Sequence, residues 1–222
     1  MIASTAAERR ARWLRGHIPG EVGIWIFIFG DMSLYGALFA SFISDRSKTP
    51  ALFDRSATTL HLWFGAVNTM LLLTSSLAVV LGVRALRRRE GNRAPAGNHA
   101  PARSHAPAPS HAPAPNHAPL MFGIAFACGV GFVVNKYLEY SSLIRAGLLP
   151  TKNTFYTYFY VLTGIHLTHL LAGMCVLVFL WRRSRKVDWE PSDISAVESG
   201  ASFWHVVDLL WVVLFPLFYL VR

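Results

Sequence analysis

Apolar residues fall into five long runs along this sequence. The runs cover residues 22–43, 60–81, 120–145, 154–181 and 203–221. Each is near or above the ~20 residues that an α-helix needs to cross the hydrocarbon core of a bilayer. A soluble domain of this size would have shorter helices, each with a polar face. The pattern therefore predicts an all-α integral membrane protein, a bundle of five transmembrane helices.

Positive charge is distributed unevenly among the segments between these runs. One predicted side of the membrane carries Arg9, Arg10, Arg12, Arg15, Arg84, Arg87, Arg88, Arg89, Arg93, Arg103, Arg182, Arg183, Arg185 and Lys186. The loops on the other side carry Arg46, Lys48, Arg55, Arg145 and Lys152. Short cytoplasmic loops are enriched in Lys and Arg, so the N-terminus is predicted to be cytoplasmic. The net charge of +9 is then a topology signal, and nucleic acid is not expected as a partner.

Residues 91–119 have a different composition from the rest of the chain. They read GNRAPAGNHAPARSHAPAPSHAPAPNHAP, with histidines six residues apart at 99, 105, 111 and 117. Spaced imidazoles could bind a metal weakly, whereas the Pro/Ala content favours an extended, solvated chain. We expect a disordered cytoplasmic linker. The predicted organisation is a basic cytoplasmic N-terminus (1–21), helices one and two (22–90), the linker (91–119) and helices three to five (120–222).

Several ionisable residues lie within the predicted spans. They are Asp31, Lys136, Glu139, His166, His169, His205 and Asp208. Such a residue costs about 2.5–3.5 kcal/mol on insertion scales, so it normally faces a partner or a cavity. Lys136 and Glu139 are three residues apart and can pair on one helix face. Asp31 is expected to be neutral, or hydrogen-bonded to a histidine of the fourth span, which crosses the same depth.

The stretch TGIHLTHLLAG places His166 and His169 on one helix face, where they could hold a haem or a metal ion. A membrane haem needs a second histidine at matching depth. His205 is predicted near the inner end of the fifth span, roughly 13 Å from the level of His169. Two histidines, even with Asp31, make a sparse ligand set for a transition metal. We therefore predict structural, hydrogen-bonded histidines and no catalytic, cofactor-binding or metal-binding residue.

Four motifs resemble subunit III of the haem–copper oxidases. FWHVVDLLWVVLFPLFYLVR resembles the closing helix of that family, with its W-H-x-V-D-x-x-W core, and TGIHLTHLLAG resembles the preceding helix. NKYLEYSSLI is similar to the segment with a glutamate–tyrosine pair, and IWIFIFGDMSLYGALFASF to the helix with a buried carboxylate. That carboxylate is Asp31 here, where the family usually has glutamate. Five predicted spans replace the seven of the mitochondrial form, as in a short bacterial branch that accompanies oxidases or nitric oxide reductases.

The resemblance implies a non-catalytic accessory subunit of a respiratory cytochrome c oxidase in the bacterial inner (plasma) membrane. Such a subunit packs beside catalytic subunits I and II, which hold haem and copper, and supports complex stability, phospholipid binding and proton uptake in aerobic electron transport. The candidate structural or proton-uptake residues are Asp31, Glu139, His166, His169, His205 and Asp208. The candidate lipid contacts are His166, His205 and Trp211. One alternative is an accessory subunit of a nitric oxide reductase, and another is an autonomous membrane haem or metal protein.

Overall fold

The computed structural model describes residues 22–93, 117–186 and 191–220, and all of its regular elements in these ranges are helical. They are α2 (Val22–Lys48), α3 (Pro50–Ala57), α4 (Leu62–Arg93), α5 (Ala118–Arg145), α6 (Thr154–Ser184), α7 (Pro191–Phe215) and a π-helical turn, η1 (Pro216–Leu220). Five helices are long and apolar enough to cross a membrane: α2, α4, α5, α6 and α7 with η1. The predicted all-α membrane fold and its five spans are confirmed.

The boundaries of the predicted segments need correction at two places. The linker was expected to cover 91–119, but α4 continues to Arg93 and α5 already begins at Ala118. The last span was expected to begin at residue 203, whereas α7 begins at Pro191 and its apolar part covers Ser195–Leu220. Glu198 interrupts the apolar pattern there, but its Oε1 lies 2.7 Å from Arg87 Nη2 on α4, so the carboxylate is paired. The N-terminal segment and most of the linker lie outside the described residues.

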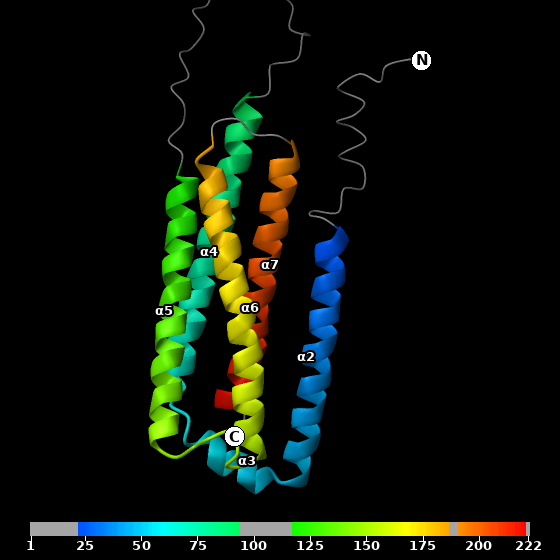
Figure 1. The fold of residues 1–222 in the computed structure, drawn as a ribbon, viewed down its shortest axis with the longest axis vertical. Coiled ribbons are helices and arrows are strands. Elements are labelled where there is room, and N and C mark those ends of the chain that lie inside the picture. Colours follow the sequence, from blue (N-terminus) through cyan, green and yellow to red (C-terminus); the bar gives the residue numbers. More distant parts are fainter. Residues whose placement is uncertain (1–21, 94–116, 187–190, 221–222) are drawn as a thin grey trace, which may run out of the picture.

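Four of the helices form one bundle, and the fifth stands beside it (Figure 1). Within the bundle α4 packs against α5 and α7, and α6 packs against α5 and α7. Helix α2 contacts α6, α7 and the short helix α3 much more sparsely. Large apolar side chains on α2 remain exposed, including Ile26 and Phe29. The chain runs up and down in Figure 1, so α2 begins at the upper end and η1 lies near the lower end.

Local sequence signals account for two of the helix ends. Asn153 is the N-cap of α6, and its side chain accepts a hydrogen bond from the backbone N–H of Tyr156. After α5, Gly147 has a φ of +72°, in the left-handed region that favours glycine. The N–H groups of Gly147 and Leu148 donate to the carbonyl oxygens of Ile144 and Leu143, which is the Schellman pattern. These bonds end α5 and turn the chain into the loop before α6.

Helix packing depends on glycines at close approaches. A Cβ atom on Gly173 of α6 would lie 2.8 Å from Trp204 Cε3 of α7, and one on Gly129 of α5 would lie 3.4 Å from Trp204 Cη2. Trp204 is fully buried, so its indole ring occupies the space that these two glycines leave open. The contact between α6 and α7 therefore requires a glycine at position 173, whereas a Cβ atom on Gly129 would lie at ordinary contact distance from the tryptophan.

Candidate functional site

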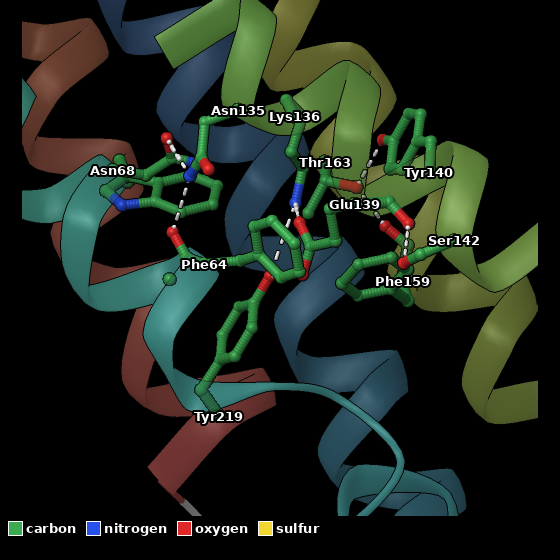
Figure 2. A network of polar contacts seen from close by, with 12 residues as sticks. Phe64, Asn68, Asn135, Lys136, Glu139, Tyr140, Ser142, Phe159, Thr163 and Tyr219 are labelled. Carbon is green, nitrogen blue, oxygen red and sulfur yellow. Dashed lines mark hydrogen bonds and ion pairs between the residues drawn. The ribbon is translucent and has the colours of Figure 1, made fainter. Parts of the chain in front are cut away.

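The most enclosed polar group of the bundle is centred on Glu139 of α5 (Figure 2). Lys136 Nζ lies 2.7 Å from Glu139 Oε2, which confirms the pairing predicted from their spacing. Tyr219 of η1 donates its hydroxyl to Glu139 Oε1, and Lys136 Nζ is 3.4 Å from the same hydroxyl. Lys136 and Glu139 are each 1% exposed. The carboxylate is thus held by one donor from its own helix and one from the end of the chain.

Aromatic rings surround the Lys136 ammonium group. Its Nζ lies 4.7 Å from the ring centre of Phe159, 5.0 Å from Trp211 and 5.3 Å from Tyr140. A cation is attracted by the negative face of an aromatic ring, and the attraction is stronger where water is excluded. The rings come from α5, α6 and α7, so this one cation lies where three helices meet. The Lys136–Glu139–Tyr219 network is therefore part of the core of the bundle.

A second group of hydrogen bonds joins α4 to α5 and α7 beside this network (Figure 2). Asn135 Nδ2 donates to Asn68 Oδ1 at 2.8 Å and to the Phe64 carbonyl oxygen at 3.0 Å. Trp211 Nε1 donates to Thr69 Oγ1 at 3.1 Å. These contacts fasten α4, which carries no ionisable residue at this depth, to the two helices that flank it.

Two residues of these networks, Tyr219 and Asn135, were not predicted from the sequence. Nothing in the sequence distinguishes Tyr219 from the other aromatic residues at the end of the last helix, and its partner Glu139 lies 80 residues away. Asn135 directly precedes Lys136 in the motif NKYLEY, and a polar residue at that depth could have been considered with it.

The predicted pairing of Asp31 with a histidine of the fourth span is confirmed. Asp31 Oδ1 of α2 lies 3.2 Å from His169 Nε2 of α6. His169 Nδ1 lies 3.0 Å from the carbonyl oxygen of Ile165, one turn earlier on its own helix. The rings of Phe27 and Tyr35 lie against the imidazole from the α2 side. This contact links the peripheral helix α2 to the bundle.

His166 and Trp211 do not fit the predicted role of lipid contacts. Both are 0% exposed, and their ring centres lie 5.3 Å apart in the interior of the bundle. His166 also packs edge-on against Phe132, and neither of its ring nitrogens has a hydrogen-bond partner among the described residues. The expectation of a hydrogen-bonded His166 is therefore wrong as well. The lipid-contact role came from the family resemblance, whereas an ionisable residue within a span normally faces a partner or a cavity, as His166 faces the interior here.

The depth assigned to His205 also needs correction. Because α7 begins at Pro191, His205 lies well inside the helix, next to Trp204, which contacts Gly173 of α6. The predicted offset of roughly 13 Å from His169 is therefore wrong. The two histidines nevertheless face different helices, since His169 contacts Asp31 of α2 and His205 Nδ1 lies 2.7 Å from Ser76 Oγ of α4. They do not converge on a common centre.

The described residues contain no group of three or more His, Cys, Asp or Glu side chains placed to hold a metal ion. Glu139 and Asp31 are each in contact with a basic side chain. These carboxyl groups and their basic partners can form ion pairs and can bind or release protons inside the bundle.

Comparison with known proteins gives the same family as the motifs. A family model described as cytochrome c oxidase subunit III matches residues 115–221. The cytochrome c oxidase subunit 3 of Synechocystis sp. is 30% identical over 99% of this chain and 83% of its own length. The chain belongs to the cytochrome c oxidase subunit III family. The subunit 3 of Bacillus sp. (strain PS3) is 26% identical over 90% of this chain and 84% of its own length. The probable subunit 3 of Mycobacterium tuberculosis is 24% identical over 99% and 97%.

The structure explains why the subunit III motifs occur together. Gly173 closes the motif TGIHLTHLLAG, and Trp204 opens the W-H-x-V-D motif that packs on it. The second tryptophan of that motif, Trp211, lies against His166 of the first. The two motifs of this family are therefore the two halves of one helix contact, between α6 and α7.

Proposed function

We propose that this chain is the non-catalytic subunit III of a respiratory haem–copper terminal oxidase, where it packs beside catalytic subunits I and II. The three relatives named above are all cytochrome c oxidase subunits. The assignment rests on one observation: the chain is 30% identical, over 99% of its length, to a protein named cytochrome c oxidase subunit 3. The ion pairs of Glu139 and Asp31 lie within this chain, and we assign the redox chemistry to the partner subunits.

The proposed location is the bacterial plasma membrane, with the N-terminus in the cytoplasm. The basic clusters at residues 84–88 and 182–186 lie at the same end of the bundle, at the end of α4 and the end of α6 (Figure 1). An excess of Lys and Arg marks the cytoplasmic side of a membrane protein. Labelling of single cysteines should reach residues 49–61 from outside the cell, and residues 94–116 only after the membrane is opened.

Stability, lipid binding and proton uptake are the tasks we propose for this subunit. For lipid, a hollow at the lower end of α2 is lined by Ser41, Ser44, Asp45, Lys48 and Tyr158. Lys48 is paired with Asp45 at 2.9 Å but is 68% exposed, so its ammonium group can also meet a phospholipid phosphate. His205, which is half-buried, remains a candidate lipid contact. The candidates for proton uptake are the ionisable residues implied by the resemblance: Asp31, Glu139, His166, His169, His205 and Asp208.

The assignment is tested by purification of the tagged chain from its native membrane. We expect haem-containing catalytic subunits to co-purify and the preparation to consume oxygen with reduced cytochrome c. The chain produced alone is expected to show no Soret band. A Soret band of that isolated chain at about one haem per chain would contradict the accessory role and favour an autonomous haem protein. Reduction of nitric oxide, without oxygen consumption, would instead identify a nitric oxide reductase as the partner.

A further inference from the structure

Three side chains of α4 and α7 form a polar cluster apart from the network around Glu139. Ser76 Oγ of α4 lies 2.7 Å from His205 Nδ1 of α7. Asp208 lies three residues after His205, on the same face of α7, and Ser76 is near enough to influence its carboxyl group. Asp208 is only 4% exposed, and neither of its oxygens has a hydrogen-bond partner among the described residues. A buried carboxyl group without a partner is costly, so its position next to Ser76 calls for a physical explanation.

The hydrogen bonds of this cluster can run in two directions. A serine hydroxyl donates one hydrogen bond and accepts others. If Ser76 donates to an ionised Asp208, His205 Nδ1 must donate to Ser76, and His205 Nε2 carries a lone pair. If Asp208 itself holds a proton, it donates to Ser76, Ser76 donates to His205 Nδ1, and Nε2 carries the hydrogen. The hydrogen bond between Ser76 and Asp208 is not formed in the structure, so either chain requires one of these two groups to rotate first.

Asp208 is the enclosed end of this chain of groups. It is buried, whereas Ser76 and His205 are only partly buried. His205 lies ten residues after Ser195, where the apolar part of α7 begins, or roughly 15 Å along the helix. Lipid tails offer neither donors nor acceptors at that depth. A proton can therefore come only from water or from a polar side chain of a neighbouring subunit. It binds at His205, because an imidazole accepts a proton near neutral pH and the Ser76 hydroxyl does not.

We propose that Ser76 relays a proton between His205 Nε2 and the carboxyl group of Asp208. A proton from water or a neighbouring donor binds to Nε2, the Nδ1 proton passes to Ser76 Oγ, and the Ser76 proton passes to Asp208. His205 and Ser76 each gain and lose one proton, so the net change is one proton moved from the donor to Asp208. The reverse sequence returns it.

The other acidic groups of the spans lack this arrangement. Glu139 contacts Lys136 and Tyr219 directly, and Asp31 contacts His169 directly. The relay deepens the proton-uptake part of the proposed function, but it rests on α4 and α7 alone. Its failure would leave the assignment as subunit III unchanged.

The relay is tested by infrared spectroscopy of the full chain in lipid nanodiscs. The C=O stretching band of protonated Asp208 is identified by its loss in Asp208→Asn, and its shift after transfer to D2O measures how fast the carboxyl proton exchanges. Ser76→Ala should slow this exchange about tenfold or more, because one hydrogen-bonded link is removed. Ser76→Thr keeps the hydroxyl and should exchange like the natural chain.

A matched control and a second variant separate the relay from general packing effects. Ser75→Ala removes the neighbouring hydroxyl, which donates to the Ala125 carbonyl oxygen and not to the relay, and should leave the rate unchanged. His205→Phe keeps a ring at a half-buried position and removes the entry point, so it should slow exchange as Ser76→Ala does. Unchanged exchange in either Ser76→Ala or His205→Phe would overturn the proposal, as would the absence of any band lost in Asp208→Asn.

Discussion

Two carboxylates of the family motifs, Glu139 and Asp31, meet a basic partner in very different surroundings. Glu139 is 1% exposed, has two donors from α5 and η1, and lies in the densely packed part of the bundle. Asp31 is 9% exposed, is paired with His169, and lies on α2, which packs sparsely against the other helices. The loss of a partner is most costly where neither water nor a helix movement can relieve it. We conclude that Glu139 is part of the folded core, whereas Asp31 attaches a peripheral helix.

The largest effect is expected from Lys136→Met, which leaves Glu139 without its cation. Breaking a buried ion pair by removing one partner costs about 3–5 kcal/mol, because the remaining charge stays buried. The free energy of unfolding should fall by that amount when the chain is titrated with a denaturing detergent. A loss below about 1 kcal/mol would show that the network is open to water and differs little from the Asp31 contact.

The double variant Lys136→Met/Glu139→Gln checks the cause of that loss. With both charges removed, no uncompensated charge is buried, so much of the stability should return. Additive losses of the two single changes would mean that the residues act through packing and not as a pair.

Gly173→Ala should have the next largest effect, because its new Cβ atom would lie 2.8 Å from Trp204 Cε3. Overpacking of a filled core costs about 2–3 kcal/mol when the neighbour cannot move, and Trp204 is fully enclosed. Gly164→Ala on the same helix is the control, since nothing lies within 4 Å of its Cβ position. Thermal unfolding of the two variants in detergent measures the difference. Equal midpoints would mean that α6 and α7 can move apart freely.

Changes at Asp31 should have a smaller effect, confined to the attachment of α2. Asp31→Leu leaves His169 Nε2 without its partner and should cost about 1–2 kcal/mol, whereas Asp31→Asn keeps hydrogen-bonding capacity. The amount of each variant retained in the purified complex measures this cost, with more of the Asn form than of the Leu form expected. Equal retention would mean that Asp31 faces a polar crevice and that its contact with His169 contributes little.

The smallest effect is expected at the exposed end of α4. Arg87 Nη2 lies 2.7 Å from Glu198 Oε1, but the Arg87 side chain is 58% exposed. Glu198 is only 11% exposed, but water reaches the pair from the Arg87 side, so Arg87→Ala should lower the free energy of unfolding by at most about 1 kcal/mol. A loss comparable to that of Lys136→Met would show that α7 depends on this pair to extend as far as Pro191. The measurement is the same detergent titration, repeated at high salt to screen the charges.

Local features were predictable from the sequence because their geometry is set within one helix. The Lys136–Glu139 contact follows from a spacing of three residues, and the five spans follow from their length and apolar composition. Contacts between helices were predicted only in part. The Asp31–His169 contact was expected because the two residues lie at similar depth and a carboxyl group within a membrane span normally has a polar partner. The same reasoning left open whether His166 or His169 is the partner.

The sequence by itself determined that the chain is a five-helix membrane protein of the subunit III family, since the lengths of the apolar runs and the motif residues can be identified without a structure. Only the tertiary structure decided which faces of the helices meet. It placed Tyr219 on Glu139, Ser76 on His205 and Trp204 between Gly129 and Gly173. The physical reason is that a transmembrane helix is apolar all round, so hydrophobicity does not show which face turns inward. That choice depends on the fit of side chains from segments far apart in the sequence.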